Sequence, residues 1–228
     1  MLKKIAGSII CILLLYGLYT YQLKREENIQ PKPVTLTENT PTPSPTKTEE
    51  PTPTPTTNIE WQFPISEAKN RVTKKPFGIY ITKENSPVSP ERFYGYHTGV
   101  DFEAAAEEQN TEVYITAVCS GKILQKKWVS GYGGVVIQGC QLEGQNVTVL
   151  YGHLNIDSVK NNPPAGGSYE LKAGNIIGVL GKGYTKETDF ERKHLHLSIH
   201  KGENISLLGY VQNKEQLSNW LDPLAILK

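Results

Sequence analysis

Three histidines lie in the segment RKHLHLSIH (192–200), where they alternate mainly with aliphatic residues. Side chains two residues apart point to the same face of a β-strand, so His194, His196 and His200 share one face. The aliphatic residues between them belong to a protein core, and we therefore expect the histidines to line an exposed or half-exposed surface. Two imidazoles at this spacing are typical of a metal site or a catalytic pair, but the pair alone defines neither.

A second polar pair lies in the segment GYHTGVDFE (95–103). If this segment is extended, His97 and Asp101 face the same side, and Gly99 keeps that side open between them. With one histidine of the first segment they would offer two imidazoles and one carboxylate. Zinc with three protein ligands retains a fourth position for water, which is the catalytic arrangement. Without such a partner, His97 and Asp101 are equally well interpreted as a polar pair in a glycine-rich loop.

A further histidine, His153, lies near the end of the run VTVLYGHL (147–154). Alternation predicts that it shares a face with Val147, Val149 and Tyr151, and the glycine before it leaves room for a substrate or another backbone. A single histidine in this position is more often a hydrogen-bonded structural residue than a catalytic one.

Short β-branched and aromatic runs separated by glycine must position these residues. They predict strands over residues 112–119, 122–129, 134–140, 147–154, 175–181 and 194–200, with a hairpin connection at 130–133 and a loop at 161–168. The one helix we expect lies around 213–220 and is stopped by Pro223. The pattern favours a mainly β fold, either an antiparallel sandwich or a partly closed barrel.

The predicted hairpin brings Cys119 and Cys140 almost opposite each other. Outside the cytoplasm two such thiols form a disulfide if their Cα atoms come within about 7 Å. The alternative is a pair of small buried residues in another register. Lipid-modified cysteines follow a small residue, whereas the third cysteine, Cys11, follows Ile10. We therefore interpret Cys11 as an apolar residue of a membrane helix.

The chain divides by composition into three parts. Residues 5–21 carry no charge. As a helix they would span about 25 Å of the roughly 30 Å hydrocarbon core of a bilayer. We therefore expect residues 1–24 to form a cytoplasmic tip and a transmembrane signal anchor, with a cleaved signal peptide as the alternative. Residues 25–58, rich in proline and threonine, are predicted to be a disordered linker, and residues 59–228 one globular domain. The 24 basic and 23 acidic residues nearly cancel, which argues against a nucleic-acid-binding protein.

Three motifs occur in the order HTGVD, YGHL and HLH, after FPI and NRVTKKPFG and with VYITAVCSGKI and GYGGVVI between them. In this combination the chain resembles the lysostaphin/LytM-like zinc metalloendopeptidases, a family of peptidoglycan-cleaving enzymes. The resemblance extends from about Trp61 to about Pro223. It implies a compact antiparallel β domain of the duplicated-hybrid-motif type, with zinc in a groove.

The resemblance also implies roles for five residues. Three of them match the zinc ligands, namely His97, Asp101 and His196, and two match a pair of catalytic histidines that do not bind the metal, namely His153 and His194. In this mechanism a metal-activated water attacks the peptide carbonyl. One catalytic histidine accepts its proton, and the other stabilises the oxyanion or helps to protonate the leaving amine. The sequence does not decide which histidine has which role.

The implied substrate is a stem or cross-bridge peptide of peptidoglycan. We expect a monomer held in the cell membrane by its single N-terminal helix, with the catalytic domain outside the cytoplasm, or a secreted enzyme if that helix is cleaved. Glycyl-glycine cross-bridges and D-alanyl-diaminopimelate links are both cleaved within the family. The charged approach GKGYTKETDFERK (181–193) replaces the small Gly-Pro stretch that members commonly place before HLH, so the substrate preference stays open.

Two further expectations concern the limits of the resemblance. A catalytically silent relative that binds the cell wall or activates an amidase is the alternative function. Such relatives typically lose a zinc ligand, whereas all three are retained here. His200 lies outside the motif, and we expect it to be a structural or surface residue.

Overall fold

The structure is a computed structural model that describes residues 61–159 and 169–228. The predicted membrane anchor (1–24) and linker (25–58) lie outside the described residues, and so does the loop predicted at 161–168. Within residues 61–159 and 169–228 there is no helix with the length and apolar character needed to cross a membrane.

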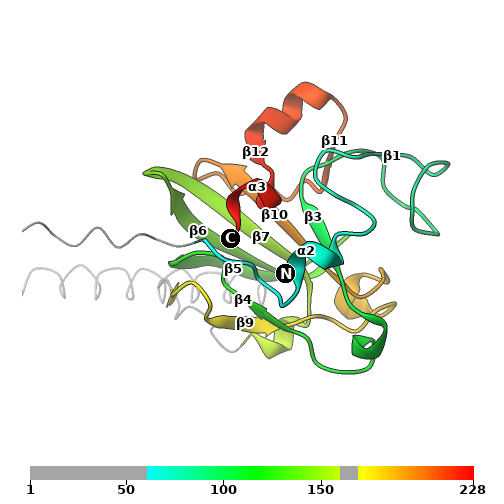
Figure 1. The fold of residues 1–228 in the computed structure, drawn as a ribbon, viewed down its shortest axis with the longest axis horizontal. Helices are drawn as coiled ribbons and strands as arrows, with labels where there is room; N and C mark the ends of the chain where they lie inside the picture. The colour runs from blue at the N-terminus through cyan, green and yellow to red at the C-terminus, as the bar shows by residue number, and fades with distance from the viewer. Residues whose placement is uncertain (1–60, 160–168) are drawn as a thin grey trace, which may run out of the picture. The chain divides into compact units, whose positions relative to one another are not determined.

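In the described part of the chain, antiparallel strands build three sheets (Figure 1). The largest has seven strands, which are β3 (Val100–Glu103), β5 (Gly121–Val129), β6 (Gly133–Leu142), β7 (Gln145–Leu154), β8 (Tyr169–Leu171), β10 (His194–Lys201) and β12 (Trp220–Leu221). Six of them follow the order β12-β10-β7-β6-β5-β8, and β3 pairs with β10 beside this path. The smaller sheets contain β1 (Tyr80–Ile81), β2 (Gly95–His97) and β11 (Tyr210–Val211) in one, and β4 (Tyr114–Thr116) and β9 (Ile176–Val179) in the other.

The helices of the described residues are short. Two are α-helical, α2 (Ala68–Arg71) and α3 (Pro223–Ile226), and four are 3₁₀ turns, namely Ala106–Glu108, Ile156–Ser158, Lys186–Thr188 and Lys214–Asn219. The mainly β, antiparallel fold class predicted from the sequence is therefore confirmed.

Two predicted elements differ from the structure. The strand predicted at 112–119 contains only β4, because Ala117 bonds to the carbonyl of Asn175 and Val118 to the hydroxyl of Tyr151 instead of continuing the ladder. The helix predicted around 213–220 is a 3₁₀ turn that leads into β12. Pro223 begins α3 instead of merely ending a helix, since its fixed φ suits a first turn that Asp222 caps.

The central strands of the main sheet, β6, β7 and β10, are buried on both faces over most of their length. On one face Leu195, Leu197 and Ile199 of β10 are fully buried and join the larger apolar core, which β4, β9 and α3 help to cover. The opposite face carries a smaller apolar cluster around Tyr132 and Leu150, and this face also receives the histidines of β10. The alternation of β10 therefore places the core and the histidines on opposite sides of one strand.

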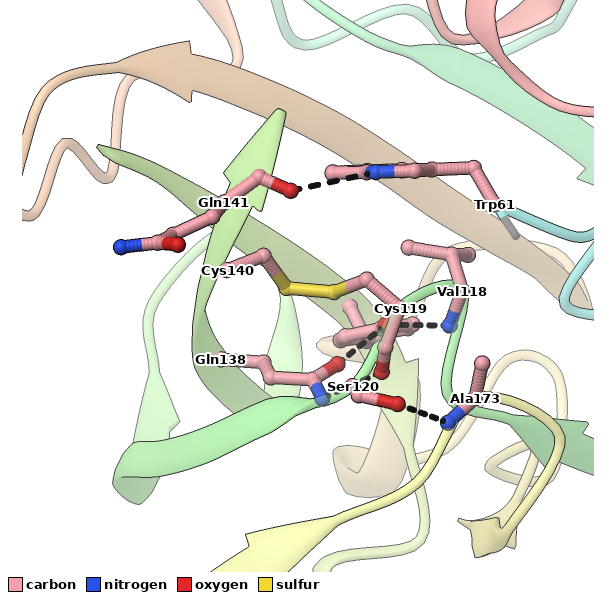
Figure 2. Close-up of a disulfide and its surroundings, with 9 residues drawn as sticks. Trp61, Val118, Cys119, Ser120, Gln138, Cys140, Gln141 and Ala173 are labelled. Carbon is pink, nitrogen blue, oxygen red and sulfur yellow. Dashed lines mark hydrogen bonds between the residues drawn. A yellow bond between two sulfur atoms is a disulfide. The ribbon is translucent and has the colours of Figure 1, made fainter. Parts of the chain in front are cut away.

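A disulfide joins Cys119 to Cys140, as the hairpin geometry predicts (Figure 2). The two Cα atoms lie 6.3 Å apart, within the range that a disulfide bridges. Gln138 donates to the carbonyl of Cys119 and accepts from the hydroxyl of Tyr151, so the bridge continues into a buried hydrogen-bond network. The disulfide thus fixes the entry of β5 against the end of β6.

We predict that the double variant Cys119→Ala/Cys140→Ala is less stable than the native chain by about 3 kcal/mol, because a disulfide constrains the unfolded state. For a domain of this size the melting temperature should fall by roughly 6 to 12 °C. Thermal unfolding with and without reductant measures the effect: reductant should destabilise the native chain and leave the double variant unchanged. Equal melting temperatures for the native chain and the double variant, each with and without reductant, would contradict the prediction.

Candidate active site

The position of β10 between β3 and β7 assembles the site. His196 lies opposite Asp101 of β3 on one side and opposite Gly152 of β7 on the other. Residues paired across adjacent antiparallel strands point to the same face of the sheet, so the imidazole and the carboxylate meet there. The prediction that His194 and His196 share one face of the strand, opposite the aliphatic residues, is confirmed.

The expected exposure of these histidines is wrong. His194 and His196 are only 2% and 3% exposed. They are buried because the ring of Tyr132 packs over His196, and because residues near Tyr210 close the other side of the pocket. The site is consequently a pocket of about 250 Å³ rather than an open sheet surface.

His97 reaches the site from the three-stranded sheet. It ends β2, and the chain then crosses through Thr98 and Gly99 into β3, so the segment is not one continuous strand. A Cβ atom at Gly99 would lie 2.5 Å from the carbonyl oxygen of Leu197 and 2.8 Å from the ring of His196. Glycine is therefore required at this crossing, for a close approach to β10 rather than for the open face expected from the sequence.

Three side-chain atoms converge at the wall of this pocket, which Asp101 and His196 line and behind which His97 is buried. The Nε2 atom of His97 lies 3.0 Å from Nδ1 of His196 and 3.3 Å from Oδ1 of Asp101. Nδ1 of His196 and Oδ1 of Asp101 are 3.1 Å apart. Ligand atoms at 2.0–2.1 Å around a tetrahedral zinc ion are roughly 3.3 Å from one another. The triangle of two imidazoles and one carboxylate therefore fits such an ion in both composition and size.

The imidazoles are prepared to bind a metal through unprotonated nitrogens. Nδ1 of His97 lies 3.2 Å from the carbonyl oxygen of Pro76, which favours a proton on Nδ1 and leaves Nε2 free. Burial lowers the pKa of His196 to about 4, so this imidazole is neutral at pH 7. Metal ligands must be deprotonated, and the neutral imidazole of His196 meets that requirement.

Arg192 binds the second oxygen of the Asp101 carboxylate. It donates from Nη2 to Oδ2 of Asp101 at 2.8 Å and from Nε to Glu103 at 2.8 and 3.0 Å. Burial alone would raise the pKa of Asp101, but nearby imidazoles, those of His194 and His97 foremost, outweigh it and hold that pKa well below its ordinary value. Asp101 is therefore an anion whose Oδ1 alone remains for a metal.

His194 and His153 form a pair beside the convergent atoms. Their ring centroids lie 4.1 Å apart. Nδ1 of His194 lies 2.9 Å from the carbonyl oxygen of Arg192, and Nδ1 of His153 lies 3.3 Å from that of Thr188. Burial above all places the pKa of His153 well below its ordinary value, so His153 is neutral at neutral pH.

The predicted orientation of His153 is wrong. Val149 and Tyr151 point into the larger core, whereas His153 packs against His194 and Tyr132 on the other face. The reason is a backbone φ of 62° at His153, next to a β-bulge where β7 pairs with β6. A left-handed residue interrupts the alternation of a strand and turns this side chain into the site.

Several residues of the pocket were not predicted from the sequence. Tyr132 belongs to a segment interpreted only as a hairpin turn. Its ring lies against Gly152, where a Cβ would come 2.7 Å from Tyr132, and its buried hydroxyl has no hydrogen-bond partner among the described residues. The sequence feature that points to Tyr132 is Gly152, the glycine before His153, because only glycine leaves room for this ring. Arg192 was recognised only as part of a charged approach to the histidines.

A buried ion pair was also missed. Nζ of Lys75 lies 2.6 Å from Glu91 and donates at 3.0 Å to the hydroxyl of Tyr210, whose ring is 5.1 Å from that of His97. Burial would raise the pKa of Glu91, but hydrogen bonds from Lys75 and Ser86 lower it below its ordinary value. No local pattern marks Lys75, because its partners come from distant parts of the chain. His200, by contrast, packs edge-on against Trp220 at 4.9 Å and does not line the pocket.

One family model matches the part of the chain that carries this site. Residues 95–207 match the model described as peptidase family M23, and this part of the chain belongs to that family. The chain thus carries a domain of a family of hydrolases that cleave peptide bonds.

Several solved structures are similar to the chain. LytU is 22% identical with a TM-score of 0.43, and the match covers 69% of this chain and 90% of LytU. A Ruminococcus gnavus protein assigned as a glycyl-glycine endopeptidase LytM is 18% identical with a TM-score of 0.43, over 75% of this chain and 62% of that one. A protein from Pseudomonas aeruginosa assigned as a peptidase M23 is 20% identical with a TM-score of 0.34, and the match covers 60% of this chain and 49% of that one. The chain thus spans less than two thirds of the last two proteins. No curated protein sequence matches it.

We predict that Gly99→Ala weakens the binding of a metal ion such as zinc to these three donor atoms by about tenfold or more, which is the effect expected when a support of a metal ligand is displaced. The new methyl group must push the ring of His196 away from His97 and Asp101. Competition with a chelator of known affinity measures the change. Gly139→Ala is the matched control, because its Cβ meets only the flexible end of Leu124, at 3.2 Å. Unchanged zinc affinity in Gly99→Ala would contradict the prediction.

Proposed function

We propose that this protein is a zinc-dependent endopeptidase that hydrolyses peptide bonds of peptidoglycan, with His97, Asp101 and His196 as the metal ligands. The observation that carries the proposal is the convergence of three donor atoms within 4.8 Å, two of them from residues that line a pocket with two further histidines. Membership of a peptidase family agrees with this chemistry.

Zinc held by three protein ligands supplies a water whose pKa is lowered to about 7 and a Lewis acid for the scissile carbonyl. The protein's own groups determine how that chemistry is used. Arg192 occupies Oδ2 of Asp101, which keeps the carboxylate in one orientation and leaves a single oxygen for the metal. The backbone carbonyl of Pro76 fixes the orientation of His97 in the same way.

The two remaining histidines are placed for proton transfer. A proton on Nδ1 of His153 satisfies the carbonyl of Thr188, which leaves Nε2 of His153 unprotonated for the substrate side. Nε2 of His194 lies 3.3 Å from Oδ2 of Asp101, and this contact favours a protonated Nε2. We therefore assign His153 as the general base and His194 as the proton donor and oxyanion stabiliser.

The location proposed for the enzyme is outside the cytoplasm, tethered to the membrane by residues 1–24 through the linker 25–58. The Cys119–Cys140 disulfide supports an oxidising compartment, since disulfides are rare in the cytosol. A soluble substrate would not require a tether, whereas peptidoglycan is an insoluble network next to the membrane. A glycyl-glycine bond, which is named for one of the similar structures, is one candidate for the bond that is cleaved.

We predict that two histidine variants separate metal binding from catalysis. His196→Ala should lose stoichiometric zinc, because two donor atoms remain of three. His153→Ala should retain zinc and lose kcat by about 10²- to 10⁴-fold, the usual contribution of a general base. Zinc content by elemental analysis and hydrolysis of purified peptidoglycan provide the two measurements. His200→Ala is the control, since His200 does not line the pocket. Full activity of His153→Ala would refute its assigned role.

We also predict that the full chain releases new peptide termini from purified peptidoglycan. A chelator should abolish the release, and added zinc should restore it. Digestion of defined muropeptides followed by mass spectrometry identifies the bond, because the new amino terminus distinguishes a glycyl bond from a diaminopimelate bond. Stoichiometric zinc without hydrolysis of any muropeptide would refute the endopeptidase assignment.

A further inference from the structure

A second pocket, of about 290 Å³, adjoins the catalytic pocket. The two share Glu191 and Arg192 as lining residues, so they are neighbouring parts of one surface. Tyr184 and Phe190 line the second pocket from the charged segment before β10, and residues 87–90 line it from the connection between β1 and β2. A ligand that reached past Glu191 and Arg192 would contact both pockets.

The two aromatic residues of this pocket have exposed rings and unfavourable backbone φ angles. Tyr184 and Phe190 are 68% and 65% exposed, so burial contributes little to their stability. Their φ angles are 59° and 64°, in the left-handed region that bulky residues rarely adopt. Two exposed rings on unfavourable backbone contribute little to folding, and such outliers gather where a ligand is bound.

The segment that carries the rings is held in one conformation. The backbone of Tyr184 donates to the carbonyl of Glu191 at 2.7 Å, and that of Phe190 donates to Thr185 at 2.7 Å. Arg92 donates to the carbonyl of Asp189, also at 2.7 Å, and so ties this segment to the β1–β2 connection. The backbone that carries the rings is consequently held in place, which lowers the entropy lost when a ligand binds here.

The charges in the pocket favour a neutral ligand. Arg92 pairs with Asp189 and Glu191, so its charge is already compensated. Arg192 pairs with Asp101 and Glu103 in the same way, and Lys74, the third cation of the lining, lies 3.5 Å from Glu103. These groups still offer hydrogen bonds in a pocket that two aromatic residues line. A pyranose ring is neutral and combines an apolar C–H face, which stacks on aromatic rings, with hydroxyl groups that bond to charged side chains.

We propose that this pocket binds a sugar unit of the glycan strand while the attached peptide occupies the catalytic pocket. The identity of the larger substrate rests on the proposed function; the saccharide preference rests on the exposed rings, the compensated charges and the rigid segment. The pocket would make the enzyme prefer peptide that is still joined to its glycan.

The test uses the variants Tyr184→Asn and Phe190→Asn in the full chain. Asparagine tolerates the left-handed backbone, so each variant removes a ring without adding strain. Tyr114→Asn is the matched control, since Tyr114 is 55% exposed and lines neither pocket. Chitotetraose is the probe, and its binding is measured by calorimetry or NMR. We expect each ring variant to bind it about tenfold more weakly, as loss of a stacking surface implies.

Hydrolysis distinguishes the possible occupants. The two ring variants should raise KM for intact peptidoglycan and leave hydrolysis of the same peptide without glycan unchanged. An equal rise for the free peptide would show that the pocket binds peptide and would overturn the proposal. Failure of the native chain to bind chitotetraose, or equal binding by the ring variants, would overturn it as well. Ring-dependent binding without hydrolysis of any substrate would support the pocket and refute the proposed function.

Discussion

The pairing of β10 with β3 and β7 is the constraint on which the site depends. One register places His196 beside Asp101 and also beside Gly152, which leaves space for Tyr132. A slip of one residue would send the histidines into the apolar core and Leu195 into the pocket, at the cost of several buried aliphatic side chains. The hydrophobic core therefore selects the arrangement of the polar site, and Gly99 permits the close approach that completes it.

The polar residues around β10 fall into two groups, those that offer metal-binding atoms and those that orient them. His97, Asp101 and His196 offer the donor atoms, and backbone carbonyls and Arg192 orient them. Arg192 is buried with two carboxylates, so its loss would leave unpaired negative charge inside the protein. The charged segment that leads into the HLH motif thus has a structural role at its end and, in our proposal, a binding role at Tyr184 and Phe190.

Much of the fold and of the site followed from periodicity. Alternation in 194–200 gave the correct faces of β10, and the hairpin around 130–133 gave the correct disulfide, because both depend on local spacing. The orientation of His153 did not follow, since one positive φ reverses it and no residue type at 153 signals this. Lys75 could not be predicted either, because its buried charge becomes acceptable only when Glu91 and Tyr210 meet it in the folded chain.

The opposite faces of β10 have a consequence for how this enzyme can change. Leu195 and Leu197 have no contact with solvent, yet each lies one residue from an imidazole of the site. A methyl group gained or lost in that core shifts the strand by a fraction of an ångström, because protein interiors are close-packed. Catalytic distances can therefore be adjusted from behind the sheet, by substitutions that never touch metal, water or substrate.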